Sequence, residues 1–338
     1  VRLADLTTLR VGGDAPAFIH ATTEPQLIAA VQQADHQGEP VLVIGGGSNL
    51  LIADEAYPGL VVHADVRGVA VQELGELVFI TAACGEPWDA FVESCLASGM
   101  NGLEALSGIP GTVGATPIQN VGAYGVEISS RIATVRVWDR QQQILRDLSP
   151  QECRFSYRHS AFKDAPGHWI VLAVTFALAR TGMSRIAYQQ LADVLGLNVG
   201  DTAFAAEIRE AVLHLRHEKG MLLEVADHDT WSAGSFFTNP MVTQAFAAGL
   251  PSDCPRYPAG GQVKLSAAWL IEHAGMHRGF ALNERASIST KHALAITNRG
   301  TATAGDLIAL AREVRARVQR QFGIILQPEV RLIGCSLD

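Results

Sequence analysis

The stretch that most constrains the fold runs from Val41 to Ile52 and reads VLVIGGGSNLLI. Four apolar, mostly β-branched residues are typical of a buried strand, and the three glycines after them free the backbone to adopt positive φ. A backbone of this kind can turn its N–H groups toward an anion such as a phosphate. The alternative is a plain tight turn between two strands.

Two common phosphate-binding loops do not fit this stretch. The dinucleotide fingerprint G-x-G-x-x-G requires a glycine where Leu50 stands, and a helix should follow it, whereas another apolar segment follows here. The P-loop requires Gly-Lys-Ser/Thr, and no lysine lies nearby in the sequence. The turn therefore belongs to neither a Rossmann domain nor a P-loop domain.

A second glycine-dense stretch runs from Gly102 to Ser129 and reads GLEALSGIPGTVGATPIQNVGAYGVEIS. A loop this long within a compact domain usually has a function, and an irregular structural loop is the alternative. Glycines allow a flat ligand or a pyrophosphate to lie directly against the backbone. Together with the first turn, this loop predicts two backbone surfaces around one large cofactor.

Composition excludes several classes of protein. The 338 residues are 48% apolar and 18% charged, which is typical of a globular chain long enough for two or three domains. The net charge of −8 argues against nucleic-acid binding. No apolar run is long enough to span a membrane, and the N-terminus lacks the charged-then-apolar order of a signal peptide. Five scattered cysteines, never spaced C-x-x-C, predict buried thiols in a reducing cytoplasm.

The periodicity of apolar residues predicts an α+β chain whose character changes within 205–220, or alternatively in the 180s. The first part is strand-rich, with strands expected at 41–44, 61–66, 77–85 and 168–179, and a hairpin over 133–149. Helices are expected at 23–35, 87–98, 203–219, 264–275 and 303–323, with a further strand at 291–298. Thr23 is the expected N-cap of the first helix, and Thr303 and Asp306 form a capping pattern at the start of the last.

Arg158 and Ser235 lie in short segments that resemble catalytic motifs without matching them. Ser160 and Lys163 form S-x-x-K, but the S-D-N and K-T-G triplets of serine acyltransferases are absent, so the neighbouring Arg158 is the more interesting residue. In SAGSFFTNP, Phe237 replaces the last glycine of the G-x-S-x-G elbow, and the neighbours of Ser235 predict a dry, constrained position. A surface ion-pairing arginine and a strand-edge serine are the alternatives.

Two further patterns involve charged or metal-ligating residues. Glu329 and Arg331 would lie on one face of an extended strand, with a solvated strand edge as the alternative. The histidine pairs at 214 and 217 and at 273 and 277 lack the glutamate of H-E-x-x-H. We therefore expect no metal site.

Together these segments resemble one family, UDP-N-acetylenolpyruvoylglucosamine reductase, the flavoenzyme of peptidoglycan precursor synthesis. The resemblance runs nearly end to end and is carried by GGGSNLL, the loop from Gly102, FSYRHSAFK, WSAGSFFTNP and QPEVRLIG. HEKGMLLEVADHDTWSAGSFFTNP and STKHALAITNRGTATAGD are most similar to the actinobacterial branch. Tyr188 in IAYQQL resembles the tyrosine of the mobile loop in the longer form of the enzyme.

The resemblance implies an α+β architecture: an FAD-binding fold of the vanillyl-alcohol-oxidase type in two subdomains, plus a C-terminal α+β substrate-binding domain. The implied divisions are 1–60 and 61–212 for the two subdomains, 213–327 for the substrate domain, and 328–338 for a strand returning to the active site. It also implies non-covalent FAD, NADPH as co-substrate, and a cytoplasmic monomer that binds neither nucleic acid nor membrane.

The implied reaction reduces UDP-N-acetylglucosamine enolpyruvate to UDP-N-acetylmuramate, which links the chain to cell-wall biogenesis, cell shape and division. A hydride passes from reduced FAD to C3, and Ser235 gives a proton to C2. The catalytic residues would be Arg158, Ser235 and Glu329. Substrate would be bound by Tyr188, Lys219, Asn239 and Tyr257. FAD would be bound by Arg10, Gly45, Gly46, Gly47, Ser48, Asn49, Ile109, Pro110, Gly111, Gly114, Ala115, Asn120, Gly122, Ala123, Arg216 and Arg331.

Two rival interpretations remain. Another flavoprotein of the same fold would share the glycine loops but has no reason to carry SAGSFF and PEVR together. A non-enzymatic protein that binds FAD or a nucleotide sugar would hold flavin that NADPH does not reduce. Gln327 stands where many members of the family have glutamate, and we expect no effect on the chemistry.

Overall fold

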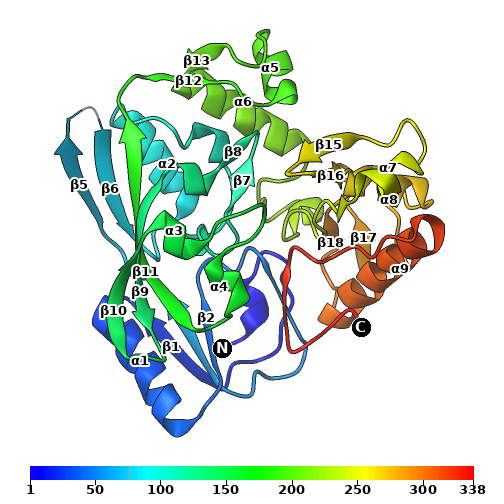
Figure 1. The fold of residues 1–338 in the computed structure, drawn as a ribbon. Coiled ribbons are helices and arrows are strands. Elements are labelled where there is room, and N and C mark those ends of the chain that lie inside the picture. The colour runs from blue at the N-terminus through cyan, green and yellow to red at the C-terminus, as the bar shows by residue number, and fades with distance from the viewer. Residues whose placement is uncertain (76) are drawn as a thin grey trace. The chain divides into compact units, whose positions relative to one another are not determined.

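The computed structural model describes residues 1–75 and 77–338, which form two compact units (Figure 1). The first unit contains Val1, Ala15–Gly46 and Tyr57–Glu218. The second contains Arg2–Asp14, Gly47–Ala56 and Lys219–Asp338. Two N-terminal segments thus make their contacts with the C-terminal part of the chain. The division at residues 60, 212 and 327 remains a prediction.

The first unit is built on two sheets. A parallel sheet has the strand order β1-β4-β2, and an antiparallel sheet has the order β10-β9-β11-β6-β5. The hairpin β7-β8 and the antiparallel pair β12-β13 complete the unit. The strands are β1 (Ala17–Ala21), β2 (Val41–Ile44), β4 (Leu60–Ala64), β5 (Val69–Leu74), β6 (Leu77–Ala83), β7 (Gly122–Ala123), β8 (Val126–Glu127), β9 (Ile132–Asp139), β10 (Ile144–Leu148), β11 (Trp169–Ala179), β12 (Met183–Arg185) and β13 (Thr202–Phe204).

The three helices that the sequence predicts in the first unit begin and end within two residues of the expected limits, and three further short helices were not predicted. The Thr23 hydroxyl accepts from the Gln26 N–H at the start of α1, and Gly38 ends that helix in the left-handed conformation. Apolar residues on one face of α1 pack against the parallel sheet. The helices are α1 (Glu24–Gln37), α2 (Trp88–Ala97), α3 (Pro150–Cys153), α4 (Ala161–Asp164), α5 (Gln189–Leu195) and α6 (Ala205–Glu218), with 3₁₀ turns η2 (Glu104–Leu106), η3 (Val113–Ala115) and η4 (Ile128–Ser130).

The long glycine-rich stretch lies between α2 and β9 and is held by the core. Trp88, Phe91 and Phe176 form a buried aromatic cluster beneath it. The Trp88 indole Nε1 donates to the Leu106 carbonyl at 2.8 Å, which ties the loop to α2. The loop is therefore an ordered surface over a packed core.

The second unit is assembled from short elements. Its sheets have the orders β14-β16-β15, β17-β18 and β19-β3. The strands are β3 (Leu50–Ile52), β14 (Met241–Val242), β15 (Arg256–Ala259), β16 (Gln262–Leu265), β17 (Ala286–Ile288), β18 (Ile296–Asn298) and β19 (Arg331–Ile333). The helices are α7 (Gln244–Ala248), α8 (Ala267–His273) and α9 (Ala304–Phe322), with 3₁₀ turns η1 (Leu3–Leu6) and η5 (His228–Thr230).

Two predicted elements of the second unit are shorter than expected. The helix expected from residue 264 begins at Ala267, because Lys264 and Leu265 pair with β15 as part of β16. The strand expected from residue 291 begins at Ile296, because 289–292 form a turn whose N–H groups bond to side chains. The capping box of α9, between Thr303 and Asp306, is confirmed.

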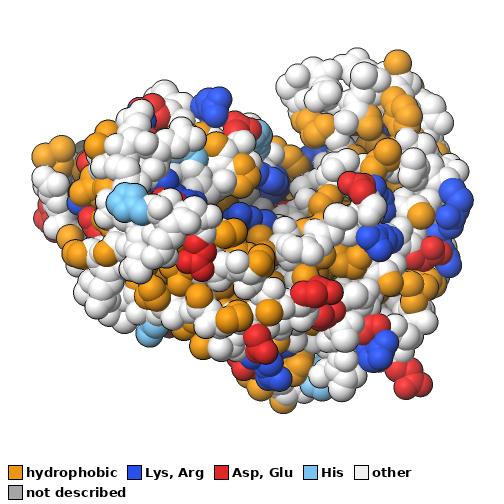
Figure 2. Space-filling view, turned by 90° about the horizontal axis from the view of Figure 1, so that it is seen from below, with side chains coloured by type: hydrophobic (Ala, Val, Ile, Leu, Met, Phe, Trp, Pro, Cys, Tyr) orange, Lys and Arg blue, Asp and Glu red, His pale blue; other side chains and the backbone are white. Residues whose placement is uncertain are grey.

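Lys and Arg side chains are interspersed with Asp and Glu on the face shown in Figure 2, with apolar side chains between them. Within the described ranges, no helix has the length and apolar character that crossing a bilayer requires. The same residues contain no group of three His, Cys, Asp or Glu side chains arranged to hold a metal ion.

Candidate active site

The first two glycines of the Gly45–Gly47 turn lie directly against the longer glycine-rich loop. A Cβ atom on Gly46 would come within 2.8 Å of the Gly111 Cα, and one on Gly45 within 2.4 Å of the Thr112 Oγ1. Contacts this short leave no room for a side chain, so only glycine permits the approach. The structure thus brings together the two stretches that the sequence predicts to share a cofactor. Thr112 was not predicted.

The other half of the turn belongs to the second unit. Gly47 has φ +57°, and a Cβ there would lie 1.9 Å from the Leu6 carbonyl oxygen. The Thr8 N–H donates to the Gly47 carbonyl at 3.2 Å, and the Thr8 hydroxyl donates to the Ser48 carbonyl at 3.3 Å. The turn is therefore fixed by residues 6–8, and this role of Thr8 was not predicted from the sequence.

Asn49 connects this turn to the C-terminal strand. Its side-chain Nδ2 donates to the Glu329 carbonyl at 3.2 Å, and its own carbonyl accepts from the Arg331 N–H at 3.0 Å. Parallel pairing of β3 with β19 continues this contact from Arg331 opposite Leu50. Two candidate segments 280 residues apart are thereby adjacent in one unit.

Asn120 is buried at the centre of the long loop. Its φ is +49°, and its Nδ2 donates to Glu127 Oε2 at 2.8 Å and to the Ser156 carbonyl at 3.0 Å. Its Oδ1 accepts from the Ser129 N–H at 3.1 Å. These three hydrogen bonds fix the shape of the loop around Asn120. Its side chain therefore has a structural role in addition to the predicted contact with the cofactor.

The other loop candidates differ in exposure. Gly114 is buried, and a Cβ there would lie 2.5 Å from the Cys84 Cβ, so a side chain is excluded. Ala115 is exposed. The partly exposed candidates in this loop are Ile109, Pro110, Gly111, Gly122 and Ala123.

Arg158 lies beside the end of the same loop. Its Nη2 donates to the Gly122 carbonyl at 2.9 Å, and its guanidinium lies 5.4 Å from the centroid of the Tyr157 ring. Its backbone has φ +52°, a conformation that is costly for a residue with a long side chain. Ser160 is fully buried and donates to the Ile118 carbonyl, so the S-x-x-K serine has a structural role.

Tyr124 lies beside Tyr188 and interacts electrostatically with Arg216. The rings of Tyr124 and Tyr188 are perpendicular, with centroids 5.8 Å apart, and Tyr188 is 45% exposed just before α5. Burial lowers the pKa of the Arg216 guanidinium, and the neighbouring Tyr124 acts in the opposite direction. Burial also raises the pKa of Tyr124. Tyr124 was not predicted, although it lies between predicted residues of the glycine-rich loop, in Gly122-Ala123-Tyr124-Gly125.

Ser235 and Glu329 lie on adjacent extended segments of the second unit. The Glu329 N–H donates to the Phe236 carbonyl at 2.8 Å. Phe237 and Pro328 form an isolated antiparallel β-bridge. Phe236 and Phe237 are buried, whereas Ser235 is partly exposed. The expectation of a dry position for Ser235 is wrong, because the two phenylalanines fill the core and the serine lies at its edge.

Three candidates for substrate binding are spread over the second unit. The Asn239 Oδ1 accepts from the Ala267 N–H at 2.9 Å, which fixes the start of α8. Tyr257 is half exposed on β15, and the Lys264 Nζ lies 5.8 Å from its ring centroid. Lys219 is partly exposed and directly follows α6.

Arg10 and Arg331 differ in their surroundings. Arg10 has φ +56°, and its guanidinium lies 5.7 Å from the centroid of the Trp231 ring. Its Nε is buried and has no hydrogen-bond partner among the described residues. Arg331 is exposed on β19. The Arg10 N–H could therefore donate to an anionic group.

Two family models match the chain. The one described as "FAD binding domain" matches residues 15–147, and the one described as "UDP-N-acetylenolpyruvoylglucosamine reductase, C-terminal domain" matches residues 226–333. A protein of the latter name from Thermobifida fusca is 49% identical over 350 residues, which cover 100% of this chain and 98% of the relative. The chain belongs to the UDP-N-acetylenolpyruvoylglucosamine reductase family.

Other relatives agree with this assignment. A protein of the same name from Nocardia farcinica is 49% identical, with coverage of 100% of this chain and 90% of the relative. The solved structure of UDP-N-acetylenolpyruvylglucosamine reductase from Thermus caldophilus has a TM-score of 0.62 at 27% identity, covering 98% and 97% of the two chains. The predicted family and fold class are confirmed, and the chain is an FAD-binding oxidoreductase.

The residues present fit a flavin dinucleotide. Gly46 is exposed and Gly111 is partly exposed, so the backbone where the two glycine-rich stretches meet is open to a ligand and carries no side chain there. The buried Arg10 Nε supplies an unpaired donor suited to a phosphate oxygen.

Proposed function

We propose that this chain reduces the enolpyruvyl ether of UDP-N-acetylglucosamine to UDP-N-acetylmuramate, using non-covalent FAD and NADPH, in peptidoglycan precursor synthesis. The two full-length relatives support the substrate class by their names. The proposal extends to a cytoplasmic monomer that takes part in cell-wall biogenesis. Bound FAD would supply hydride transfer from NADPH to C3 of the enolpyruvyl group.

The observation that carries the proposal is the hydrogen bond between Glu329 N–H and the Phe236 carbonyl. This bond joins the two segments that carry Ser235 and Glu329, which supports the assignment of a proton donor and an acid to the same small group. Hydride addition at C3 leaves negative charge on C2 and the adjacent carboxylate. Groups already oriented toward that charge stabilise the transition state without reorganising.

Each of the three proposed catalytic residues has a separate role. Ser235 gives a proton to C2; since a hydroxyl is a weak acid, the rate depends on its placement. Protonated Glu329 donates a hydrogen bond to an enolate oxygen. Arg158 supplies a fixed positive charge, and its bond to the Gly122 carbonyl limits its rotation.

Ser235→Ala tests the proposal by separating the two half-reactions. Reduction of FAD by NADPH needs no substrate proton and should run at about the parent rate. Reoxidation by the enolpyruvyl substrate should slow by about 10²–10⁴-fold. Stopped-flow absorbance of the flavin follows both steps. Slowing of both steps to the same extent, or of neither, would remove Ser235 from the proton-donor role.

Arg158→Ala and Glu329→Ala provide a second readout. Both residues act on charge that appears in the transition state, so turnover should fall far more than substrate affinity. Steady-state kinetics measure the two quantities. A variant in which KM rises and kcat is retained would assign that residue to ground-state binding.

A further inference from the structure

We propose that His292 is a positioning residue for Ser235: its Nε2–H donates to the Ser235 Oγ and leaves the serine proton directed at the substrate. This inference rests on the proposed function and adds a residue to it. His292 is partly exposed and belongs to the same unit as Ser235.

The two side chains are neighbours because their backbones pair. Ser235 forms an antiparallel bridge with Ala295, and the Phe236 N–H donates to the Leu294 carbonyl at 2.8 Å. This pairing places the turn that precedes Leu294 beside Ser235. The His292 Nε2 then lies 3.5 Å from the Ser235 Oγ, at the outer limit of a hydrogen bond. Catalytic hydrogen bonds are often this long before substrate binds.

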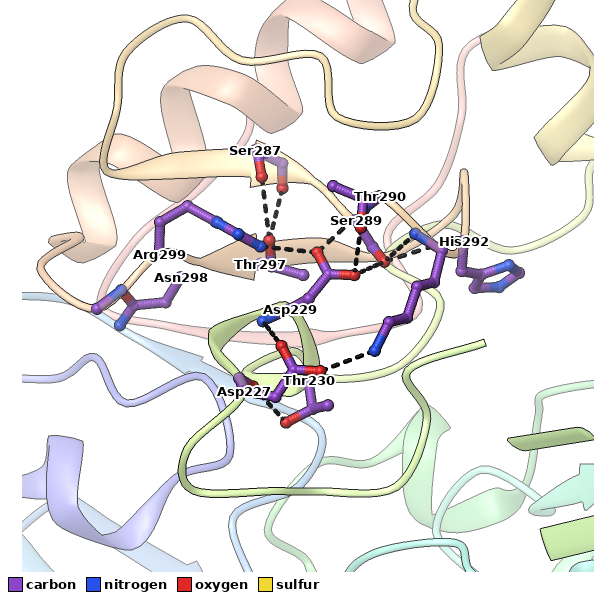
Figure 3. A network of polar contacts seen from close by, with 12 residues as sticks. Asp227, Asp229, Thr230, Ser287, Ser289, Thr290, His292, Thr297, Asn298 and Arg299 are labelled. Atoms are coloured by element: carbon purple, nitrogen blue, oxygen red, sulfur yellow. Dashed lines mark hydrogen bonds and ion pairs between the residues drawn. The ribbon is translucent and has the colours of Figure 1, made fainter. Parts of the chain in front are cut away.

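A buried carboxylate holds the turn that carries His292 (Figure 3). The Ser289 Oγ accepts from the His292 N–H at 3.1 Å and donates to Asp229 Oδ2 at 2.9 Å. Asp229, only 4% exposed, also accepts from the Thr290 N–H at 3.0 Å and from the Arg299 Nη1 at 2.7 Å. The backbone of His292 is therefore fixed through Ser289 to a buried carboxylate that is paired with Arg299.

The chemistry of a hydroxyl explains what this contact would do. A serine hydroxyl has one proton to give and two lone pairs with which to accept. If the Ser235 O–H donated to His292, that proton would point away from C2. If the imidazole N–H donates instead, the serine proton remains available and charge that develops on Oγ is stabilised. The second arrangement is the one that supports proton transfer to C2.

Replacement of His292 by alanine, glutamine and leucine tests the inference. His292→Ala should slow flavin reoxidation by the enolpyruvyl substrate by about 10–100-fold, the effect of one lost hydrogen bond to a charged group. Flavin reduction by NADPH and substrate KM should change by about twofold or less. His292→Gln should recover most of the rate, since its amide N–H can donate to Oγ. His277→Ala, at an exposed histidine of the same unit, is the control.

A double mutant separates positioning from general damage. In a Ser235→Ala background, His292→Ala should slow reoxidation by no more than about twofold, because its target is already absent. Equal slowing in both backgrounds, or a glutamine variant as slow as alanine, would overturn the inference. His292→Leu retains bulk without a donor and gives the same test if alanine unfolds the protein. Failure of the unmodified protein to be reoxidised by substrate would instead overturn the proposed function.

Discussion

At Gly46 a single methyl group would separate two loops. Its Cβ would meet the Cα of Gly111, a backbone atom that cannot rotate away, so one loop would have to move. We expect Gly46→Ala to cost about 1–3 kcal/mol of stability, the usual range for overpacking, and to release most of the bound FAD. The ratio of flavin to protein absorbance after purification measures the loss. Gly249→Ala is a matched control, because its Cβ would lie 3.5 Å from its nearest contact.

A Gly46→Ala protein that retained stoichiometric FAD would contradict the assignment of this turn to the cofactor. Loss of FAD in both Gly46→Ala and Gly249→Ala would point to general instability instead.

Residue types in Ser235-Phe236-Phe237 identified a candidate proton donor, yet the sequence predicted its environment incorrectly. Two adjacent phenylalanines suggested a dry surrounding, but their burial leaves Ser235 at the edge of the core. His292 carried no recognisable signal, since it lies 57 positions away and reaches Ser235 through strand pairing. Local pattern indicates residue chemistry and gives little information on contacts between distant segments.

The helix α9 illustrates an element whose limits are set locally. The Thr303 hydroxyl accepts from the Asp306 N–H, and the Asp306 carboxylate accepts from the Thr303 N–H, which satisfies donors that the first turn leaves free. Thr303→Ala should lower the free energy of unfolding by about 1 kcal/mol. Urea unfolding measures this loss, with the exposed Thr301→Ala as control. An equal loss in both variants would contradict the capping role.

Asp227, the N-cap of the turn η5, and Lys291 form an ion pair with a predictable pH dependence. The bond from Lys291 lowers the pKa of Asp227 below 3.8, and the same bond raises the pKa of Lys291 above 10.5. The stability from Asp227 is present above pH 3.8 and is lost as pH falls through its lowered pKa. The stability from Lys291 is present below pH 10.5 and is lost as pH rises through its raised pKa.

A double-mutant cycle of Asp227→Asn and Lys291→Met measures this pair. Because both side chains are about one-third exposed, at 34% and 36%, we expect a coupling of only about 0.5–1 kcal/mol at neutral pH. Urea midpoints should show the coupling shrinking well below pH 3.8. Coupling that stayed constant down to that range would contradict the ion pair.

At the scale of the whole molecule, long-range pairing determines what sequence cannot predict. The strand β3 pairs in parallel with β19, so that Leu51 lies opposite Leu332. Neither segment contains a signal for the other, because two short apolar runs can pair with many partners. The same limit applies to the contact between Gly46 and Gly111, which glycine content suggested without specifying. The resemblance to a family predicted that the C-terminal strand returns to the active site and that both glycine-rich stretches bind one cofactor, which the periodicity of apolar residues could not indicate.

The visible spectrum of the purified protein tests the central claim most directly. We expect a yellow protein that absorbs at about 450 nm. NADPH should bleach this absorbance in the absence of oxygen, and UDP-N-acetylglucosamine enolpyruvate should restore it and give a product heavier by two hydrogens. Flavin that NADPH bleaches but this substrate does not restore would indicate a different flavoprotein. Flavin that NADPH never bleaches would contradict the reductase.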